Sequence, residues 1–169
     1  MRIRENNGFH AGEKKTNGRR RKPTEGGIQM KILVLDGQGG KMGKTVVEHL
    51  KANFPEQELI AIGTNSIATS TMLKAGADKG ATGENPIVYN STDADIIIGP
   101  IGMTVANSLL GEVTPRMAAA VGGCRAAKIL IPSSKCNSYV VSTQNLNLSE
   151  YVSLVVAKVR EIMSEYRCL

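Results

Sequence analysis

Short apolar runs recur along the chain at regular intervals. Residues 31–35, 59–62, 95–98 and 128–131 are nearly continuous in Ile, Leu, Val and Ala, and each run is bounded by Gly, Pro or Asp. Such runs lack the polar alternation of a half-exposed strand and are typical of strands covered on both faces of a parallel sheet. A last short strand is predicted at residues 139–142.

Segments with apolar residues at helical spacing lie between these runs. The pattern predicts helices over residues 40–54, 67–75, 104–110 and 116–121, and a long terminal helix that Ser149 caps. Asn65 or Ser66 is expected to cap the second helix, while Thr114 with Pro115 opens the fourth. Residues 78–93 are rich in Gly, Thr, Asn and Pro, so we expect a short strand and at most a short helix there.

Strands that alternate with helices at this spacing predict an α/β fold, a three-layer Rossmann-like sandwich with a mainly parallel sheet. Right-handed crossovers then place every strand-to-helix loop at one edge of the sheet, and ligands of such sheets bind at that edge. The loops that follow the predicted strands are therefore the first place to look for a site.

The loop after the first strand is rich in glycine. Glycines permit a tight turn and a close approach to a pyrophosphate, and the amides of the following helix can hold phosphates. The strict dinucleotide pattern G-x-G-x-x-G fails at Met42, but glycines recur at every third position, and residues 39–43 resemble the loop of NAD(P)-dependent dihydrodipicolinate reductase. The loop residues predicted to contact a cofactor are Asp36, Gly37, Gln38, Gly39, Gly40, Lys41, Met42 and Gly43.

Two other interpretations of this loop stay open. The ending Gly43-Lys44-Thr45 is that of a P-loop NTPase, but the pattern G-x-x-x-x-G-K-[ST] requires glycine where Gln38 stands. The later strand also ends in Gly99 rather than in an Asp that would help to hold Mg²⁺. Alternatively, the loop is a tight connection that binds nothing.

The ends of two further strands complete the predicted crevice. A domain that binds NAD normally places an acid after its second strand to hold the ribose 2′-OH. Here Thr64, Asn65 and Ser66 stand there, which slightly favours NADP over NAD, although helix capping explains Asn65 and Ser66 equally well. Across the crevice we expect Gly99, Pro100, Ile101 and Gly102 to face the glycine loop. Asp36 either binds a ribose or a metal, or simply caps the turn.

No catalytic set emerges from the remaining residues. His49 lies inside the first helix, so no Ser-His-Asp or Cys-His arrangement can be built. Glu84, Asn85, Lys135 and Asn137 are the best polar candidates in loops at the same edge, and each is equally explained as a solvated loop residue. We predict no metal site, and the catalytic residues stay unknown, which favours binding or sensing over catalysis.

Charge is concentrated at the start of the chain. Residues 1–29 contain eight Lys and Arg against three Asp and Glu, whereas residues 30–169 contain thirteen against twelve. The first segment is predicted to be a disordered basic tail, and an upstream extension that the native protein lacks is a further hypothesis, because Met30 opens directly into a strand. Nucleic-acid binding is not favoured, since no aromatic residues interleave with the basic run.

The rest of the composition fits one domain over residues 30–169. The longest apolar run, at 117–121, is far shorter than the roughly 20 residues that cross a bilayer. The three cysteines, Cys124, Cys136 and Cys168, are widely spaced, which favours free thiols in the cytoplasm. We expect no membrane partner, and a homo-oligomer stays open.

Residues 36–44, 63–70, 81–85 and 99–102 together resemble a bacterial family of small Rossmann-like proteins that is defined only as a domain of unknown function. The resemblance spans about residues 30–160. It implies a compact cytoplasmic protein and supplies no catalytic residue. The leading hypothesis is a nucleotide-binding domain for NAD or NADP that acts as a sensor or as a cofactor-binding subunit. The alternatives are a protein that binds coenzyme A or a phosphorylated metabolite, and a small NAD(P)-dependent enzyme.

Overall fold

A computed structural model of the chain describes residues 23–24, 27–133, 140 and 146–167. Five parallel strands form one sheet in the order β5-β4-β3-β6-β7. Their bounds are β3 Ile32–Asp36, β4 Leu59–Gly63, β5 Lys79–Thr82, β6 Ile96–Pro100 and β7 Ala127–Ile131. The strand order reverses between β3 and β6, which is the switch point of a doubly wound sheet. The predicted Rossmann-like α/β fold is confirmed.

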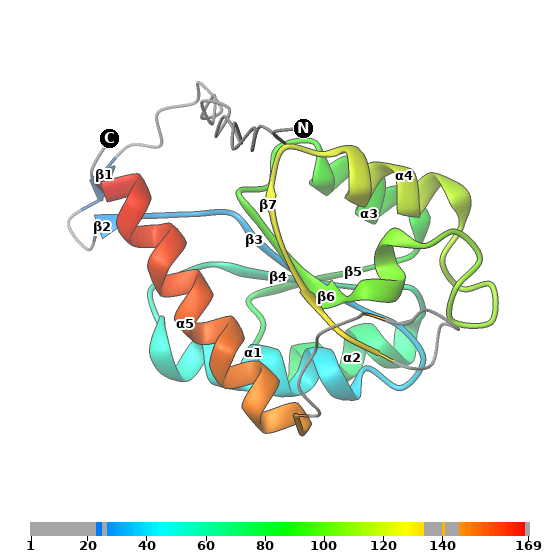
Figure 1. The fold of residues 1–169 in the computed structure, drawn as a ribbon, viewed down its shortest axis with the longest axis horizontal. Coiled ribbons are helices and arrows are strands. Elements are labelled where there is room, and N and C mark those ends of the chain that lie inside the picture. The colour runs from blue at the N-terminus through cyan, green and yellow to red at the C-terminus, as the bar shows by residue number, and fades with distance from the viewer. Residues whose placement is uncertain (1–22, 25–26, 134–139, 141–145, 168–169) are drawn as a thin grey trace, which may run out of the picture.

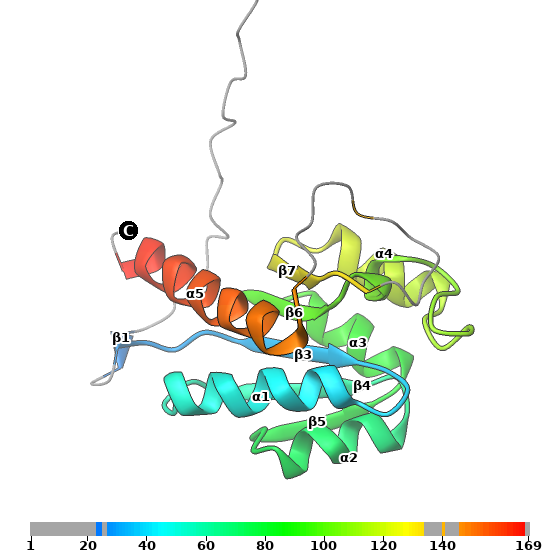
Figure 2. The same cartoon turned by 60° about the horizontal axis from the view of Figure 1, so that its bottom comes forward.

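Helices cover both faces of the sheet (Figures 1 and 2). On one face lie α1 (Lys41–Asn53), α2 (Ser66–Lys74) and α5 (Leu148–Arg167). The other face is covered by α3 (Glu84–Ser91) and α4 (Pro115–Gly123), with the short 3₁₀ helix η1 (Ile101–Thr104) after β6. Two short strands of two residues each, β1 (Pro23–Thr24) and β2 (Gly27–Ile28), pair with each other in an antiparallel manner, apart from the main sheet. The sequence analysis did not predict this pair.

Each face has its own apolar core. Successive residues of β3 point into the two cores in alternation. Ile32 and Val34 face α1 and α5, whereas Leu33 and Leu35 face α3 and α4. The predicted stripe of α5 is confirmed, since Val152, Val155, Val156, Val159 and Met163 are buried in the first core. Burial on both faces explains why the central strands β3 and β6 are continuous apolar runs in the sequence. The edge strand β7 is also apolar, although most of its residues are only partly buried.

The predicted helix ends are largely confirmed. The Asn65 side chain accepts a hydrogen bond from the Ala68 N–H at the start of α2, and Thr114 caps α4 with Pro115 in the first turn. At α5, however, Ser149 is not the cap. Asn147 accepts from the Glu150 N–H, and Glu150 accepts from the Asn147 N–H, so the Asn-x-x-Glu pair forms a reciprocal capping box.

One predicted helix is wrong. Residues 104–110 form the end of η1 followed by turns, with positive φ at Asn107, Leu109 and Leu110. Of the apolar residues in this segment, Leu109 is buried whereas Leu110 is 98% exposed, so their spacing does not reflect a helix face. The strand predicted at residues 139–142 and most of the basic tail lie outside the described residues, so both stay predictions.

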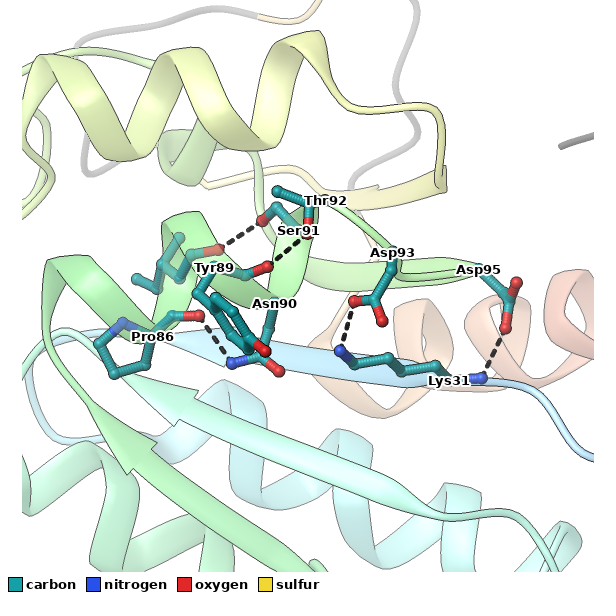
Figure 3. Close-up of polar contacts among 9 residues, drawn as sticks. Lys31, Pro86, Tyr89, Asn90, Ser91, Thr92, Asp93 and Asp95 are labelled. Atoms are coloured by element: carbon teal, nitrogen blue, oxygen red, sulfur yellow. Dashed lines mark hydrogen bonds and ion pairs between the residues drawn. The ribbon is translucent and has the colours of Figure 1, made fainter. Parts of the chain in front are cut away.

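The amino edge of the sheet is closed by paired charges (Figure 3). Lys31, just before β3, places its ammonium 2.5 Å from Asp93, and its backbone N–H donates to Asp95 at 2.7 Å. Next to it, Lys51 pairs with Asp78, which accepts from the Leu59 N–H at the start of β4. These contacts hold the amino ends of β3 and β4 in place. The candidate site lies at the opposite, carboxyl edge of the sheet.

Candidate functional site

The glycine loop joins β3 to α1 at the carboxyl edge in one tight turn. The Gly40 N–H donates to the Gly37 carbonyl oxygen at 3.0 Å, and Gly40 has φ +68°, in the left-handed region. Gln38 also has a positive φ, of 50°. Helix α1 begins at Lys41, directly after the turn, so its first amides point toward the edge where ligands of such sheets bind.

Packing within the protein explains three of the four loop glycines. A Cβ on Gly37 would lie 2.8 Å from Glu112 Oε2, one on Gly40 would lie 2.7 Å from the Ala68 Cα, and one on Gly43 would overlap Met72. Gly39 differs, because a Cβ there would meet no described atom within 4 Å and its φ is not positive. Gly39 is thus the loop glycine whose bare backbone serves no internal contact among the described residues.

Asp36 lies beneath the loop and is 6% exposed. Its Oδ1 accepts from the Gly37 N–H at 2.8 Å and its Oδ2 from the Gly43 N–H at 2.7 Å. Burial raises the pKa of this carboxyl, and the nearby negative charge of Glu112 adds to the increase, although the backbone hydrogen bonds oppose it. Of the roles predicted for Asp36, the geometry matches the capping role, because both oxygens are engaged by the loop and the first turn of α1.

A second carboxylate, Glu112, closes the β4 side of the loop. Its Oε2 accepts from the Gln38 N–H at 2.8 Å, from Thr64 Oγ1 at 2.5 Å and from Asn65 Nδ2 at 3.1 Å. Partial burial acts to raise the pKa of Glu112, but these hydrogen bonds outweigh it and hold the pKa below its ordinary value. Glu112 is therefore ionised near neutral pH and binds the loop to the end of β4.

Glu112 belongs to residues 105–113, which we call the strap. Its base is joined by hydrogen bonds from the Asn107 N–H to the Val113 carbonyl oxygen and from the Val113 N–H to the Ser108 carbonyl oxygen. The tip places Leu109, which is 6% exposed, against Gly37. The next side chain, Leu110, is 98% exposed. The strap thus lies over the glycine loop on the side of β4.

An open cleft of about 340 Å³ lies on the other side of the loop, above the carboxyl ends of β3, β6 and β7. Its floor is the glycine loop, and its walls are mainly apolar side chains with few polar groups. The lining residues are Asp36, Gly37, Gln38, Gly39, Gly40, Lys41, Met42, Pro100, Leu109, Ile131, Pro132, Ser133, Leu146, Leu148 and Tyr151. A cleft of this kind at a switch point is the usual place for a small ligand.

The structure brings together some of the predicted residues and separates others. Asp36–Met42 and Pro100 line the cleft, and Gly43 lies beside Asp36. Thr64 and Asn65 lie behind the strap, bonded to Glu112, and Ser66 opens α2 beyond them. Gly99 packs closely on the Leu35 backbone, while Ile101 and Gly102 belong to η1.

The other polar candidates are placed away from the cleft or are not described. Glu84 accepts from Thr114 Oγ1 at 2.6 Å and pairs with Arg116, so it joins α3 to α4. Lys135 and Asn137 lie outside the described residues. His49 contacts the Thr45 carbonyl oxygen within α1. Within the described part of the chain, no three His, Cys, Asp or Glu side chains are grouped as a metal site would need.

Sequence reasoning missed the strap and the α5 wall of the cleft. The signal for a loop was present, since Asn107-Ser108 and Gly111 are poor helix residues, and the Thr114-Pro115 start of α4 follows at once. The contact between Glu112 and Thr64, however, joins residues 48 apart in the sequence, so no local pattern reveals it.

The chain also resembles known proteins. No curated protein matches it. Among solved structures, it is similar to a dodecameric FMN-dependent Ubix-like decarboxylase from Escherichia coli O157:H7, with 17% identity over 78% of this chain and 76% of the other and a TM-score of 0.41. It is also similar to an arsenate reductase in the intermediate state, with 15% identity over 77% of this chain and 99% of the other and a TM-score of 0.36.

A family model agrees with the resemblance found in the sequence motifs. Residues 31–164 match the model described as Domain of unknown function (DUF3842), so the match includes the whole five-stranded sheet, the glycine loop and the strap. Within the described residues, no helix combines the length and the apolar composition needed to cross a bilayer. The chain belongs to the DUF3842 family.

Proposed function

We propose that the protein binds a nucleotide in the cleft, with a phosphate group against the glycine loop, and that NAD and NADP are the leading ligands. The observation that carries the proposal is Gly39, which lines the cleft and whose missing side chain no internal contact requires. A phosphate can approach a bare backbone more closely than it can approach any side chain.

The surroundings of Gly39 support the same ligand class. The 13-residue helix α1 begins at the loop, and its aligned peptide dipoles favour an anion at that end. Lys41 lines the cleft and is exposed, so its ammonium is available to a phosphate. Pro100, Ile131 and Leu148 offer apolar surface that suits the ring of a base or of nicotinamide.

The described residues favour a binding role over catalysis. The two carboxylates beside the loop, Asp36 and Glu112, are both engaged by hydrogen bonds within the protein. We therefore propose a cytoplasmic sensor or the cofactor-binding subunit of an oligomer. A protein that binds coenzyme A or a phosphorylated metabolite would use the same loop, and a panel of candidate ligands separates these classes.

The test is a thermal-shift panel on the full chain with NAD, NADP, ATP, GTP, FAD and coenzyme A, followed by calorimetry on any ligand that responds. A ligand at about one hundred times its Kd adds roughly 2.7 kcal/mol, which raises the Tm of a chain of this size by on the order of 5–10 °C. Shifts with NAD or NADP support the leading ligands. A shift with coenzyme A alone moves the assignment to that class, and no shift with any ligand overturns nucleotide binding.

Two glycine variants locate the site. Gly39→Val places a branched side chain in the cleft, and it should abolish the shift without lowering the Tm of the free protein, because a Cβ at this position meets nothing. Gly122→Val in α4 is the matched control, since a Cβ there also meets no described atom within 4 Å. If ligand binding survives Gly39→Val, the ligand does not lie on the glycine loop.

A further inference from the structure

Three hydrogen-bond donors at the end of β4 converge on one oxygen atom. The Gln38 N–H, the Thr64 hydroxyl and the Asn65 side-chain amide all point to Glu112 Oε2. The donors come from two elements, the glycine loop and the β4–α2 joint, which Asn65 also links by donating to the Gln38 carbonyl oxygen. A set of neutral donors gathered around one charged oxygen is how proteins hold an anionic group.

The anion that occupies this set comes from a strained segment. Leu109 and Leu110 have φ of 53° and 60°, a region that side chains other than glycine rarely adopt. Such strain persists only where other contacts impose it. Here the imposing contacts are the three hydrogen bonds of Glu112 and the burial of Leu109 on Gly37, while Leu110 is left in solvent.

The location of the donor set matches one half of a nucleotide crevice. In a doubly wound sheet, a dinucleotide extends from the switch point across the glycine loop to the end of the second strand. That second strand is β4, which ends at Gly63 beside Thr64. Leu109 both lines the cleft and packs beside Thr64 at Gly37, so the strap divides the crevice into an open half and a closed half.

We propose that the Gln38, Thr64 and Asn65 donors form a phosphate subsite that Glu112 occupies in the absence of ligand, and that a phosphate group of the bound nucleotide displaces Glu112 and opens the strap. The inference rests on the proposed function, because the displacing phosphate belongs to the nucleotide in the cleft. The strap base, held by Asn107, Ser108 and Val113, stays in place, and the tip from Leu109 to Glu112 moves.

The phosphate can come from either of two parts of a dinucleotide. A 2′-phosphate on the far ribose is present in NADP and absent from NAD, whereas both contain the pyrophosphate. If the subsite takes the 2′-phosphate, removal of Glu112 strengthens NADP binding alone. If it takes the pyrophosphate, NAD and NADP gain equally.

The main experiment compares the affinities of the full-length wild type and its variants for NAD and NADP by calorimetry. Glu112→Ala vacates the subsite and removes its charge, so we expect at least a tenfold gain in affinity for one or both nucleotides. Glu112→Gln keeps the size and an acceptor oxygen, so its gain should be smaller. The double variant Thr64→Val with Glu112→Ala lacks a donor and should lose most of the gain.

Glu84→Ala is the matched control. Glu84 has the same kind of contact, a carboxylate that accepts from a threonine hydroxyl at 2.6 Å, and lies at the same edge of the sheet, but it joins α3 to α4. We expect unchanged nucleotide affinity in this variant. Thermal unfolding of each variant without ligand separates a loss of folding from an effect on binding, and Glu112→Gln remains informative if Glu112→Ala unfolds.

A second readout follows the strap itself by hydrogen–deuterium exchange. In the wild type, saturating nucleotide should speed exchange at residues 109–112, and Glu112→Ala should show that faster exchange without ligand. If the wild type binds nucleotide in a manner that Gly39→Val blocks, but Glu112→Ala and Glu112→Gln bind with equal or lower affinity, the subsite is wrong and the proposed function stands. If no variant binds any nucleotide, both proposals fall.

Discussion

The carboxylates beside the central strands are held differently at the two edges of the sheet. At the amino edge, Asp93 pairs with Lys31, and Asp95 accepts from the Lys31 N–H just before β3 (Figure 3). Asp78 pairs with Lys51 and accepts from the Leu59 N–H at the start of β4. At the carboxyl edge, Asp36 and Glu112 also accept backbone N–H groups, but among the described residues neither forms an ion pair.

This difference distinguishes contacts that only hold the fold together from a candidate binding site. Charges that are paired with each other at the amino edge leave little field for a ligand, and their contacts only fix where the strands begin. At the carboxyl edge, Asp36 lies beneath the loop and Glu112 lies beside it, and neither forms an ion pair with a described residue. Nearby, Gln38, Leu109 and Leu110 have positive φ, which is strained for residues other than glycine. Strain and unpaired charge together are typical of functional positions.

The largest effect is expected from Gly40→Val in the glycine loop. Its left-handed φ and the Ala68 backbone, 2.7 Å from a Cβ, both oppose a branched side chain. We expect a loss of about 3 kcal/mol or more in the free energy of unfolding, and a Tm lower by roughly 10 °C. Gly39→Val, one residue away, should change stability by less than about 1 kcal/mol. Chemical denaturation gives the free energy of unfolding of each variant, and thermal unfolding gives its Tm. Equal values for the two variants would contradict the loop geometry.

A comparison of Asp36→Ala with Asp95→Ala tests the two edges directly. Asp36→Ala leaves the buried Gly37 and Gly43 N–H groups without their acceptor, which should cost about 2–4 kcal/mol in the free energy of unfolding. Asp95→Ala exposes the Lys31 N–H at a half-buried position that water can reach, so we expect about 1 kcal/mol. Urea denaturation of both variants gives the difference, and the reverse order would show that the amino edge is the more critical one.

The sequence was sufficient to predict the architecture because the signals for it are local. Residues 31–35 and 95–98 lie on buried central strands, and a strand buried on both faces must be continuously apolar. Asn65 and Thr114 cap helices through atoms only three residues away. The Asn147 and Glu150 capping box was equally local, and attention to the Asn-x-x-Glu spacing would have found it.

The candidate site was predictable only in part, because some of the residues that close it come from distant parts of the sequence. The glycine loop is visible in the sequence, and so is the position of Thr64 after a strand. Glu112, whose side chain contacts Thr64 after β4, comes from a distant segment whose apolar spacing imitates a helix. Only the tertiary structure shows that Leu109 and Glu112 divide the crevice.

A smaller effect is expected in the pH dependence of stability, which should differ between Asp36 and Glu112. Burial raises the pKa of Asp36 above its ordinary 3.8, so the folded state binds that proton more tightly, and the contribution of Asp36 to stability falls as pH rises through this window. The pKa of Glu112 is lowered from 4.5 by hydrogen bonds that outweigh its burial, so its contribution is complete above 4.5 and is lost as pH falls through the lowered value.

The unfolding free energies of Asp36→Asn and Glu112→Gln, each subtracted from that of the wild type, should therefore respond to pH in opposite ways. The Asp36 difference should fall as pH rises above 3.8, whereas the Glu112 difference should fall as pH drops below 4.5. Denaturant titrations at several pH values measure both differences. Parallel curves would mean that the two carboxyls share one environment, which would contradict the separate roles assigned to them. The Glu112→Gln difference at neutral pH should be about 1 kcal/mol, since charge-assisted hydrogen bonds become neutral ones.

The smallest effect is expected at the amino edge, from Lys31→Met. The methionine keeps the apolar stem of the half-buried lysine and removes the ammonium that contacts Asp93. A double-mutant cycle with Asp93→Asn should give a coupling free energy of about 0.5–1 kcal/mol that decreases in high salt, as for other partly exposed ion pairs. The control is Lys79→Met. Lys79 lies on the edge strand β5 and forms an exposed ion pair with Glu58, so the loss of this pair should leave the Tm unchanged. A coupling well above this range would mean that the amino edge, too, holds charge that the fold depends on, and the contrast between the two edges would then rest on the cleft and the strap alone.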